Sequence, residues 1–199
     1  MFARTVRLLL RPSWPEDASA IHQAVADEGI VHNLALVPWP YTQDDAAEFA
    51  ALDHDFDYPN FMLMLRTNGA PKLIGSCGLA RRDGAVELGY WISRPFWGQG
   101  LATEAGRAVI DVARALGHRR LVSGHFTDNP ASGRVLRKLG FRPTGRIEQR
   151  FSVGRGRYVS SALFERQLVA DSDALSGTQS AIAMPTRTGI ADPIMPRAA

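Results

Sequence analysis

The sequence predicts a single α/β domain, in which a twisted mixed sheet of about seven strands carries helices on both faces. Seven segments have the alternating or continuous apolar pattern of strands. Three of these, between residues 61 and 93, follow one another across short turns, which indicates an antiparallel run. A long amphipathic helix at 101–116 then separates the strand 85–93 from a strand at 120–126. A crossover of this kind indicates a parallel pair of strands.

The length and composition fit one domain followed by a tail. With 199 residues, 45% of them hydrophobic, the chain can bury a sizeable core. The periodic patterns end near residue 168, so the domain is expected at 1–168. Residues 169–199 are rich in Ser, Thr, Ala, Gly and Pro and lack periodicity. We therefore predict a flexible C-terminal tail at 169–199.

The N-terminal part is expected to form a strand at 5–11 and then a helix. Ser13 to Glu16 has the spacing of a capping box, and Pro15 falls in the first turn. Ile21 and Val25 provide the apolar side of this helix. Its solvated face is expected at Asp17, His22 and Gln23.

The segment 28–41 is expected to be irregular, because prolines flank Trp39 at its end. Trp39 has two open interpretations: an aromatic side chain packed under a surface connection, or a wall of a substrate pocket. Thr42 to Asp45 repeats the capping pattern, and a second helix is expected to follow it with Ala46 and Phe49 on its buried side.

The remaining elements are placed by turn residues between apolar runs. Asn68-Gly69 separates the strands 61–66 and 72–80, and the turn at 81–84 leads into the strand 85–93. Asn129 is expected to cap a last helix that Gly140 ends. The final strands are expected at 142–152 and 157–167, joined around 154–156.

The turn Gly98-Gln99-Gly100, directly before the long helix, is the first candidate for chemistry. Free N–H groups and a partial positive charge occur at a helix N-terminus, and glycines let an anion approach the backbone. The pattern alone also describes an ordinary tight turn. It is neither a Walker loop nor a G-x-G-x-x-G fingerprint, because Thr103 stands where the third glycine would be.

Two blocks of sequence resemble the GNAT acetyltransferase superfamily, on the branch of the ribosomal-protein N-terminal acetyltransferases. The first is E-L-G-Y-W at 87–91 with W-G-Q-G-L-A-T-E-A at 97–105. The second is N-P-A-S at 129–132 with V-L-R-K-L-G-F at 135–141. The resemblance spans residues 4–168. It implies the GNAT fold, with a splayed central pair of parallel strands and acetyl-CoA as cosubstrate.

The resemblance also implies which residues bind the cosubstrate. The pyrophosphate is expected on the amides that begin the long helix, with Arg94 as a further anion ligand. Pro95 stands where relatives carry Gln or Arg. Amides near the end of the strand 85–93 are expected to polarise the thioester, and Asn129 to contact the pantetheine arm. The full expected set is Ile92, Ser93, Arg94, Trp97, Gly98, Gln99, Gly100, Leu101, Ala102, Thr103, Asn129 and Ser132.

Two residues are candidates for catalysis. By resemblance Glu87 is a base that acts through water, and the alternative is a solvent-facing strand glutamate. Glu104 competes for this role, although its place in the first helical turn favours interaction with the helix dipole. Leu136 stands where many relatives have a catalytic tyrosine. Ser132 is the substitute expected to bond the departing sulfur, and capping the helix is its alternative role.

The sequence disfavours several other kinds of site and of protein. Cys77 lies in an apolar strand pattern, so we expect a buried structural thiol rather than a nucleophile. The histidines lack paired ligand spacing, so no metal is expected; His125 alone lies near the predicted site. Without an 18-residue apolar stretch or a signal sequence, a cytoplasmic protein that does not span a membrane is expected.

The sequence leaves the identity of the acceptor amine open. A peptide N-terminus, a small amine, an antibiotic and aminoacyl-tRNA all fit the resemblance, and so does a non-catalytic module that senses acyl-CoA. Nucleic acid is not expected, because the net charge is only +3 and basic runs are lacking. The arginines that would serve tRNA are Arg142, Arg146, Arg150, Arg155 and Arg157. A homodimer is expected by resemblance only.

Overall fold

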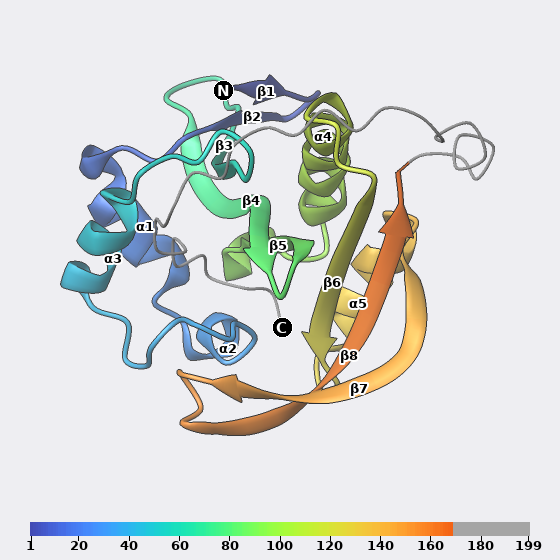
Figure 1. Cartoon of the computed structure of the whole chain (residues 1–199). Helices are drawn as coiled ribbons and strands as arrows, with labels where there is room; N and C mark the ends of the chain where they lie inside the picture. The colour runs from blue at the N-terminus through green and yellow to red at the C-terminus, as the bar shows by residue number, and fades with distance from the viewer. Residues whose placement is uncertain (169–199) are drawn as a thin grey trace, which may run out of the picture.

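The computed structural model describes residues 1–168, which form one sheet in the order β1-β2-β3-β4-β5-β6-β8-β7 (Figure 1). The predicted tail at 169–199 lies outside the described residues. The strands are β1 Ala3–Arg4, β2 Leu8–Arg11, β3 Asn60–Leu65, β4 Lys72–Arg82, β5 Ala85–Ile92, β6 Arg120–Phe126, β7 Arg142–Ser152 and β8 Arg157–Gln167. The helices are α1 Ala18–Val25, α2 Glu28–Val31, α3 Gln43–Ala50, α4 Leu101–Ala115 and α5 Pro130–Lys138, with short 3-10 turns η1 Pro15–Asp17 and η2 Arg94–Phe96.

The predicted mixed sheet is confirmed, but the strand count is eight rather than seven. The strand expected at 5–11 forms only over its second half, β2, and a short strand that was not predicted, β1, precedes it. The chain turns back before Leu8, where the Thr5 amide donates to the Leu8 carbonyl at 2.9 Å. Ala3 and Arg4 then pair with Leu10 and Leu9 as a short edge strand.

The parallel pair β5–β6 is the irregular point of the sheet. All other neighbouring strands pair antiparallel, whereas β5 and β6 have one register pair, Glu87 with Val122. Beside it, the Ser123 hydroxyl donates to the Leu88 carbonyl at 2.9 Å. Beyond this point β6 stays paired with β8 along its whole length (Figure 1). The C-terminal end of β5 therefore has no β6 partner, which is the splay expected for the central pair.

The two faces of the sheet carry separate apolar clusters. One lies between the sheet and helices α4 and α5, and Leu88, Tyr90 and Ile92 belong to it. The other lies under α1 and α3 and contains Trp91. Because successive strand residues point to opposite faces, β5 contributes to both clusters. Helices thus cover both faces, as predicted.

The predicted start of the first helix is wrong in its details. The cap is not built from Ser13 and Glu16. Instead Trp14 precedes η1, and its amide donates to Asp17 Oδ2 at 2.8 Å. Asp17 was expected on the solvated face, but it is buried and bonded to Arg11 by two contacts of 2.6 and 2.7 Å. Arg11 lies six residues away on a strand, so helical spacing could not reveal this pair.

Other local predictions are confirmed. The Thr42 and Asp45 capping box forms, with contacts of 2.7 and 3.2 Å, and α3 follows. Asn129 caps α5, and Gly117 and Gly140 take the left-handed conformation after α4 and α5. Segment 28–41 is mostly irregular, apart from the single-turn helix α2. None of the helices in residues 1–168 has the length and apolar character needed to cross a membrane.

Replacing Asp17 with Asn should lower the free energy of unfolding by about 2–4 kcal/mol near neutral pH, because it leaves the Arg11 guanidinium buried without a counter-charge. Burial raises the pKa of Asp17, but hydrogen bonds from Arg11 and the Trp14 amide outweigh it, so the pKa is lowered. The contribution is therefore present above the unfolded pKa of about 3.9 and is lost as pH falls through the folded value.

The measurement is urea unfolding of both proteins between pH 7 and pH 3. The difference should stay constant down to about pH 5 and narrow below about pH 4. Asp111→Asn is the control, because the Asp111–Arg114 pair is exposed and should contribute little. An Asp17→Asn effect no larger than the control would contradict the role of this pair.

Candidate functional site

A cleft of about 310 Å³ opens where β5 loses its parallel neighbour. Its walls are the end of β5, the turn before α4, the first turns of α4 and α5, and part of α2 with the residues after it. We call this space the central cleft. The predicted residues that line it are Ile92, Trp97, Gly98, Gly100, Leu101, Ala102, Thr103, Asn129 and Ser132. Two sequence blocks about thirty residues apart thus meet at one cavity.

The start of α4 has the geometry of an anion site. Gly98 and Gly100 take φ values of 75° and 76°, a left-handed conformation that other residues adopt only with strain. The first bond of the helix runs from the Glu104 amide to the Gly100 carbonyl at 3.0 Å. The amides of Leu101, Ala102 and Thr103 therefore precede any intrahelical partner, and these residues line the central cleft.

The turn before α4 is held by Arg7, a residue that sequence reasoning missed. Its guanidinium donates to the Gln99 carbonyl at 3.0 Å and to Glu104 Oε2 at 2.7 Å. Glu104 also accepts from the Thr5 hydroxyl and the Arg7 amide at 2.5 and 2.9 Å. Burial raises the pKa of Glu104, yet these bonds outweigh it and hold the pKa below its usual value. In the structure, Glu104 ties α4 to the segment between β1 and β2.

The side chains of Arg94, expected as an anion ligand, and of Gln99, expected to contribute its backbone amide, have partners within the protein. Arg94 donates to both Asp27 oxygens at 2.7 and 2.8 Å, which lowers the pKa of Asp27. This pair attaches η2 to the N-terminus of α2. The Gln99 side chain donates to the Pro95 carbonyl at 3.1 Å. Neither side chain lines the central cleft.

The backbone at the end of β5 supplies one of the two expected donors. The Ser93 amide is bonded to the Ile74 carbonyl of β4 at 2.8 Å, so it is directed away from β6. In an antiparallel ladder, alternate residues direct their amides to opposite sides. The Ile92 amide therefore faces the side from which β6 has departed. The Trp97 indole donates to the Ile92 carbonyl at 2.6 Å and closes the end of this strand.

At the first turn of α5, Ser132 lies against a tyrosine of β5. The Ser132 amide donates to Asn129 Oδ1 at 3.3 Å, so Asn129 caps the helix as expected. The Ser132 hydroxyl lies 2.7 Å from the Tyr90 hydroxyl, and the Tyr90 hydroxyl donates to the Ser132 carbonyl at 3.2 Å. Both side chains line the central cleft. Leu136 is buried in the core.

Sequence reasoning missed Tyr90, because it occupies one more apolar position in the alternating pattern of β5. The available signal was its hydroxyl, which needs a hydrogen-bond partner once the ring is buried. Burial raises the pKa of this phenol strongly, more than the Ser132 bond lowers it. Tyr90 is therefore a neutral donor over the physiological pH range.

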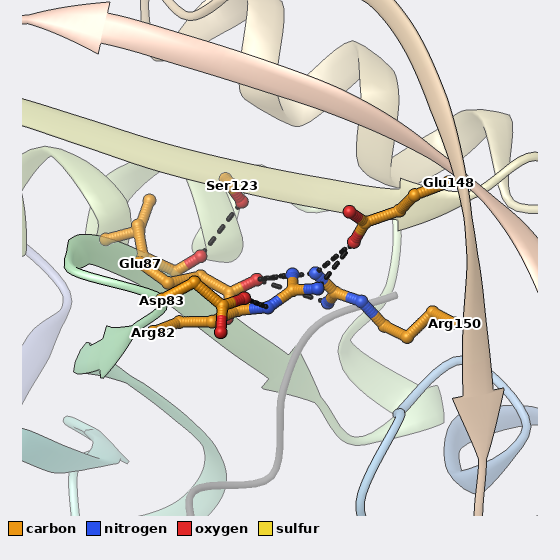
Figure 2. Close-up of polar contacts among 7 residues, drawn as sticks. Arg82, Asp83, Glu87, Ser123, Glu148 and Arg150 are labelled. Atoms are coloured by element: carbon orange, nitrogen blue, oxygen red, sulfur yellow. Dashed lines mark hydrogen bonds and ion pairs between the residues drawn. The ribbon is translucent and has the colours of Figure 1, made fainter.

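Glu87 lies at the centre of a buried ion-pair cluster (Figure 2). Its Oε1 accepts from both terminal nitrogens of Arg150 at 3.1 Å each, and from Arg82 at 3.3 Å. Both arginines also reach Glu148 Oε1, at 2.5 Å from Arg82 and 3.2 Å from Arg150. The Glu87 and Arg150 side chains are only 4% and 5% exposed. The solvent-facing alternative for Glu87 is therefore wrong.

The candidate catalytic groups lie on opposite faces of the sheet. Glu87 and Trp91 point to the face under α1 and α3, whereas Tyr90 points to the face of α4 and α5, where Ser132 lies. The opening between β5 and β6 connects these faces, and Trp91 reaches the central cleft from the first of them. Two reactants could therefore approach the same point from opposite sides.

Glu87 and Ser93 do not line the central cleft, and neither do the remaining candidates. His125 is buried, with Nδ1 2.7 Å from the Phe126 carbonyl and its ring against Phe164. Trp39 is 40% exposed and lies edge-on to His32. Cys77 is a buried thiol whose pKa is raised by burial, as expected for a structural residue. In residues 1–168, no cluster of three His, Cys, Asp or Glu could hold a metal.

Two of the five arginines considered for tRNA are used inside the protein. Arg150 belongs to the Glu87 cluster. Arg155 bonds Asp128 and the His32 carbonyl, with contacts of 2.5 and 2.6 Å. It thereby joins the tip of the β7–β8 hairpin to the segment after α2. The other three are Arg142, Arg146 and Arg157, which are exposed.

Replacing Gly100 with Ala should weaken coenzyme A binding about tenfold, because an alanine in the left-handed conformation strains the turn that presents the amides at the start of α4. Gly117→Ala is the matched control. It imposes the same left-handed strain, at φ 82°, at the far end of the same helix. Calorimetric titration and thermal melting together separate the two effects. Equal affinities in the two variants would contradict an anion site at the α4 N-terminus.

Comparison with known proteins gives a consistent result. Residues 7–142 match the sequence model of the family described as the acetyltransferase (GNAT) domain. The protein named uncharacterized N-acetyltransferase YoaA of Bacillus subtilis (strain 168) is 30% identical over 152 residues, which cover 73% of this chain and 85% of YoaA.

Solved structures agree in fold. An acetyltransferase (GNAT family) from Bacillus anthracis superposes with a TM-score of 0.71 and 22% identity, over 84% of this chain and 99% of that one. RimL, a ribosomal L7/L12 alpha-N-protein acetyltransferase solved with coenzyme A, superposes with a TM-score of 0.68 and 22% identity, over 84% and 98% of the two chains.

Proposed function

Because this chain belongs to the GNAT family of acetyl-CoA-dependent acetyltransferases, we propose that it moves the acetyl group directly to a primary amine, the α-amine of a protein N-terminus. The observation that carries the proposal is the central cleft. Three groups line this one opening through the sheet. They are the amides at the start of α4, the Ile92 amide on the side of β5 that lacks a neighbouring strand, and the Ser132 hydroxyl. Both substrates can be held there together, which gives the rate advantage of proximity.

The donor would occupy the face of α4 and α5. Its pyrophosphate would lie on the amides of Leu101, Ala102 and Thr103, which precede the helical bonding pattern. Asn129 would contact the pantetheine arm in addition to capping α5. The Ile92 amide would donate to the thioester carbonyl, whose oxygen gains negative charge as the amine attacks.

The chemistry then needs three proton movements: two from the acceptor nitrogen and one to the thiolate. The ammonium form of the acceptor loses a proton through water to Glu87, on the face of α1 and α3. The neutral amine nitrogen bonds to the carbonyl carbon and becomes positively charged. It loses its second proton to water, and the carbon–sulfur bond breaks when the tetrahedral species collapses to the amide. The electron pair of that bond stays on sulfur. Ser132 donates a hydrogen bond to this thiolate, which takes its proton from solvent after release.

The ion-pair cluster around Glu87 favours an α-amine over a lysine side chain. Two guanidinium groups hold the carboxylate in place, so its reach toward the acceptor is limited to a water-mediated path. An α-amine has a pKa of about 7.7–8.0 and is roughly a tenth neutral at pH 7, whereas a lysine amine with a pKa of about 10.4 is neutral to roughly 0.04%. The α-amine therefore needs far less help. The likeness to RimL supports the same class.

The direct test is release of free thiol from acetyl-CoA with a panel of N-terminal peptides, lysine-only peptides blocked at the N-terminus, polyamines, aminoglycosides and aminoacyl-tRNA. Peptides with free N-termini should be the preferred acceptors, and mass spectrometry should place the acetyl group on the α-nitrogen. Turnover confined to another acceptor would contradict the proposed acceptor. Tight binding of acetyl-CoA without thiol release on any amine would favour an acyl-CoA sensor.

Replacing Glu87 with Gln should lower kcat more than tenfold at pH 7, because the carboxylate that accepts the proton is lost. The amide oxygen still accepts from Arg150, and Glu148 at 3.2 Å remains a counter-charge for that arginine, so the fold should persist. The deficit should shrink as pH rises above about 8, where the α-amine is already neutral. The pH dependence of kcat/KM measures this relief.

Glu148→Gln is the control for the Glu87 test. It removes a carboxylate from the same cluster, but Glu148 lies on β7 rather than on β5. Its effect should be smaller and independent of pH in that range. A Glu87→Gln deficit that persists unchanged at pH 9 would contradict the role of base and leave a structural role for the residue.

A further inference from the structure

The Tyr90–Ser132 pair is the contact whose chemistry goes beyond the roles assigned above. Both hydroxyls are at the central cleft, where the side chains come from β5 and from the first turn of α5. The oxygens are 2.7 Å apart, and both residues are buried. Ser132 is the group proposed to bond the leaving sulfur. What Tyr90 does to the Ser132 hydrogen therefore decides whether that bond can form.

The 2.7 Å contact requires a hydrogen between the two hydroxyl oxygens, which leaves two arrangements. Each hydroxyl carries one hydrogen, and the Ser132 carbonyl is a second acceptor for Tyr90 at 3.2 Å. In the closed arrangement Ser132 donates to Tyr90, and Tyr90 donates to the Ser132 carbonyl. Both hydrogens are then used within the protein. In the open arrangement Tyr90 donates to Ser132 Oγ, and the hydrogen of Ser132 is available to the cleft.

A developing thiolate selects the open arrangement. A negative sulfur in the cleft needs a donor, and Ser132 can donate to it only when its single hydrogen is not given to Tyr90. The 2.7 Å contact then needs the hydrogen of Tyr90, which donates to Ser132 Oγ. The shift requires only rotation of two O–H bonds between acceptors that are already within reach. No covalent bond to hydrogen breaks, so the two residues act as a chain of hydrogen bonds in which each bond polarises the next.

We propose that Tyr90 is a positioning residue, which donates to Ser132 Oγ and thereby turns the Ser132 hydrogen toward the sulfur of the departing CoA. The inference rests on the role proposed for Ser132. Burial of the phenol keeps it neutral and able to donate. Tyr90 thus performs from the strand, through Ser132, part of the task for which the helix position 136 has no hydroxyl.

The test is a double-mutant cycle with Tyr90→Phe and Ser132→Ala, measured as kcat and KM for acetyl-CoA with a saturating peptide acceptor. Each single variant should lower kcat about tenfold and leave both KM and the CoA dissociation constant within about twofold. The double variant should be no slower than Ser132→Ala alone, because Tyr90 acts only through Ser132. Tyr58→Phe is the control, a half-buried tyrosine beside His118 that does not line the cleft.

The outcomes separate the inference from the proposed function. Unchanged kcat in Tyr90→Phe, with Ser132→Ala impaired, would overturn the role of Tyr90 and leave that of Ser132 intact. Equal losses from Tyr90→Phe with and without Ser132 would also overturn it, since they indicate a packing effect. An unimpaired Ser132→Ala would overturn both. Wild type that releases no thiol with any amine would overturn the proposed function itself.

A second variant guards against a folding defect in Tyr90→Phe, which thermal melting would reveal. Incorporation of 3-fluorotyrosine at position 90 keeps the ring and hydroxyl but makes the phenol a stronger donor. With Ser132 present, a kcat limited by chemistry should rise about twofold. In Ser132→Ala it should not change. If kcat does not rise in the protein that retains Ser132, Tyr90 is not the donor to Ser132.

Discussion

The separation of β5 from β6 is the constraint on which the rest of the site depends. A sheet normally satisfies every backbone N–H and C=O by pairing, and an interior strand without a neighbour is costly. Here the pairing stops after Glu87 and Val122, so the last residues of β5 face a cleft of about 310 Å³. Backbone donors that would otherwise serve a strand are left to serve a ligand.

The opening is maintained by contacts that fix each wall separately. On one side β6 is paired with β8 along all of its length, and on the other β5 is paired with β4. The Glu87–Arg150 ion pair joins β5 to β7, and Arg155 joins the β7–β8 hairpin to Asp128 and the His32 carbonyl. These links fix the position of the β6–β8–β7 half of the sheet relative to β5 and the segment after α2.

The alternation of side chains along β5 places the candidate catalytic groups on opposite faces of the sheet. Glu87 and Tyr90 are three residues apart on β5, and an odd separation in a strand places two side chains on opposite faces. One face presents the carboxylate with its arginines, and the other presents the hydroxyl pair with the helix N-terminus that suits a phosphate. In the direct transfer proposed above, this arrangement would separate the proton acceptor from the leaving group.

The sequence by itself determined the local features, because these depend on neighbours in the chain. It predicted the parallel crossover around α4, the caps at Thr42 and Asn129, and the glycine turn at 98–100, since period, capping and left-handed glycines are short-range properties. Only the tertiary structure decided the partners of charged and polar groups. Asp17 with Arg11, Glu87 with Arg150, Glu104 with Arg7 and Tyr90 with Ser132 are pairs between elements, up to 97 residues apart, and periodicity carries no signal for them.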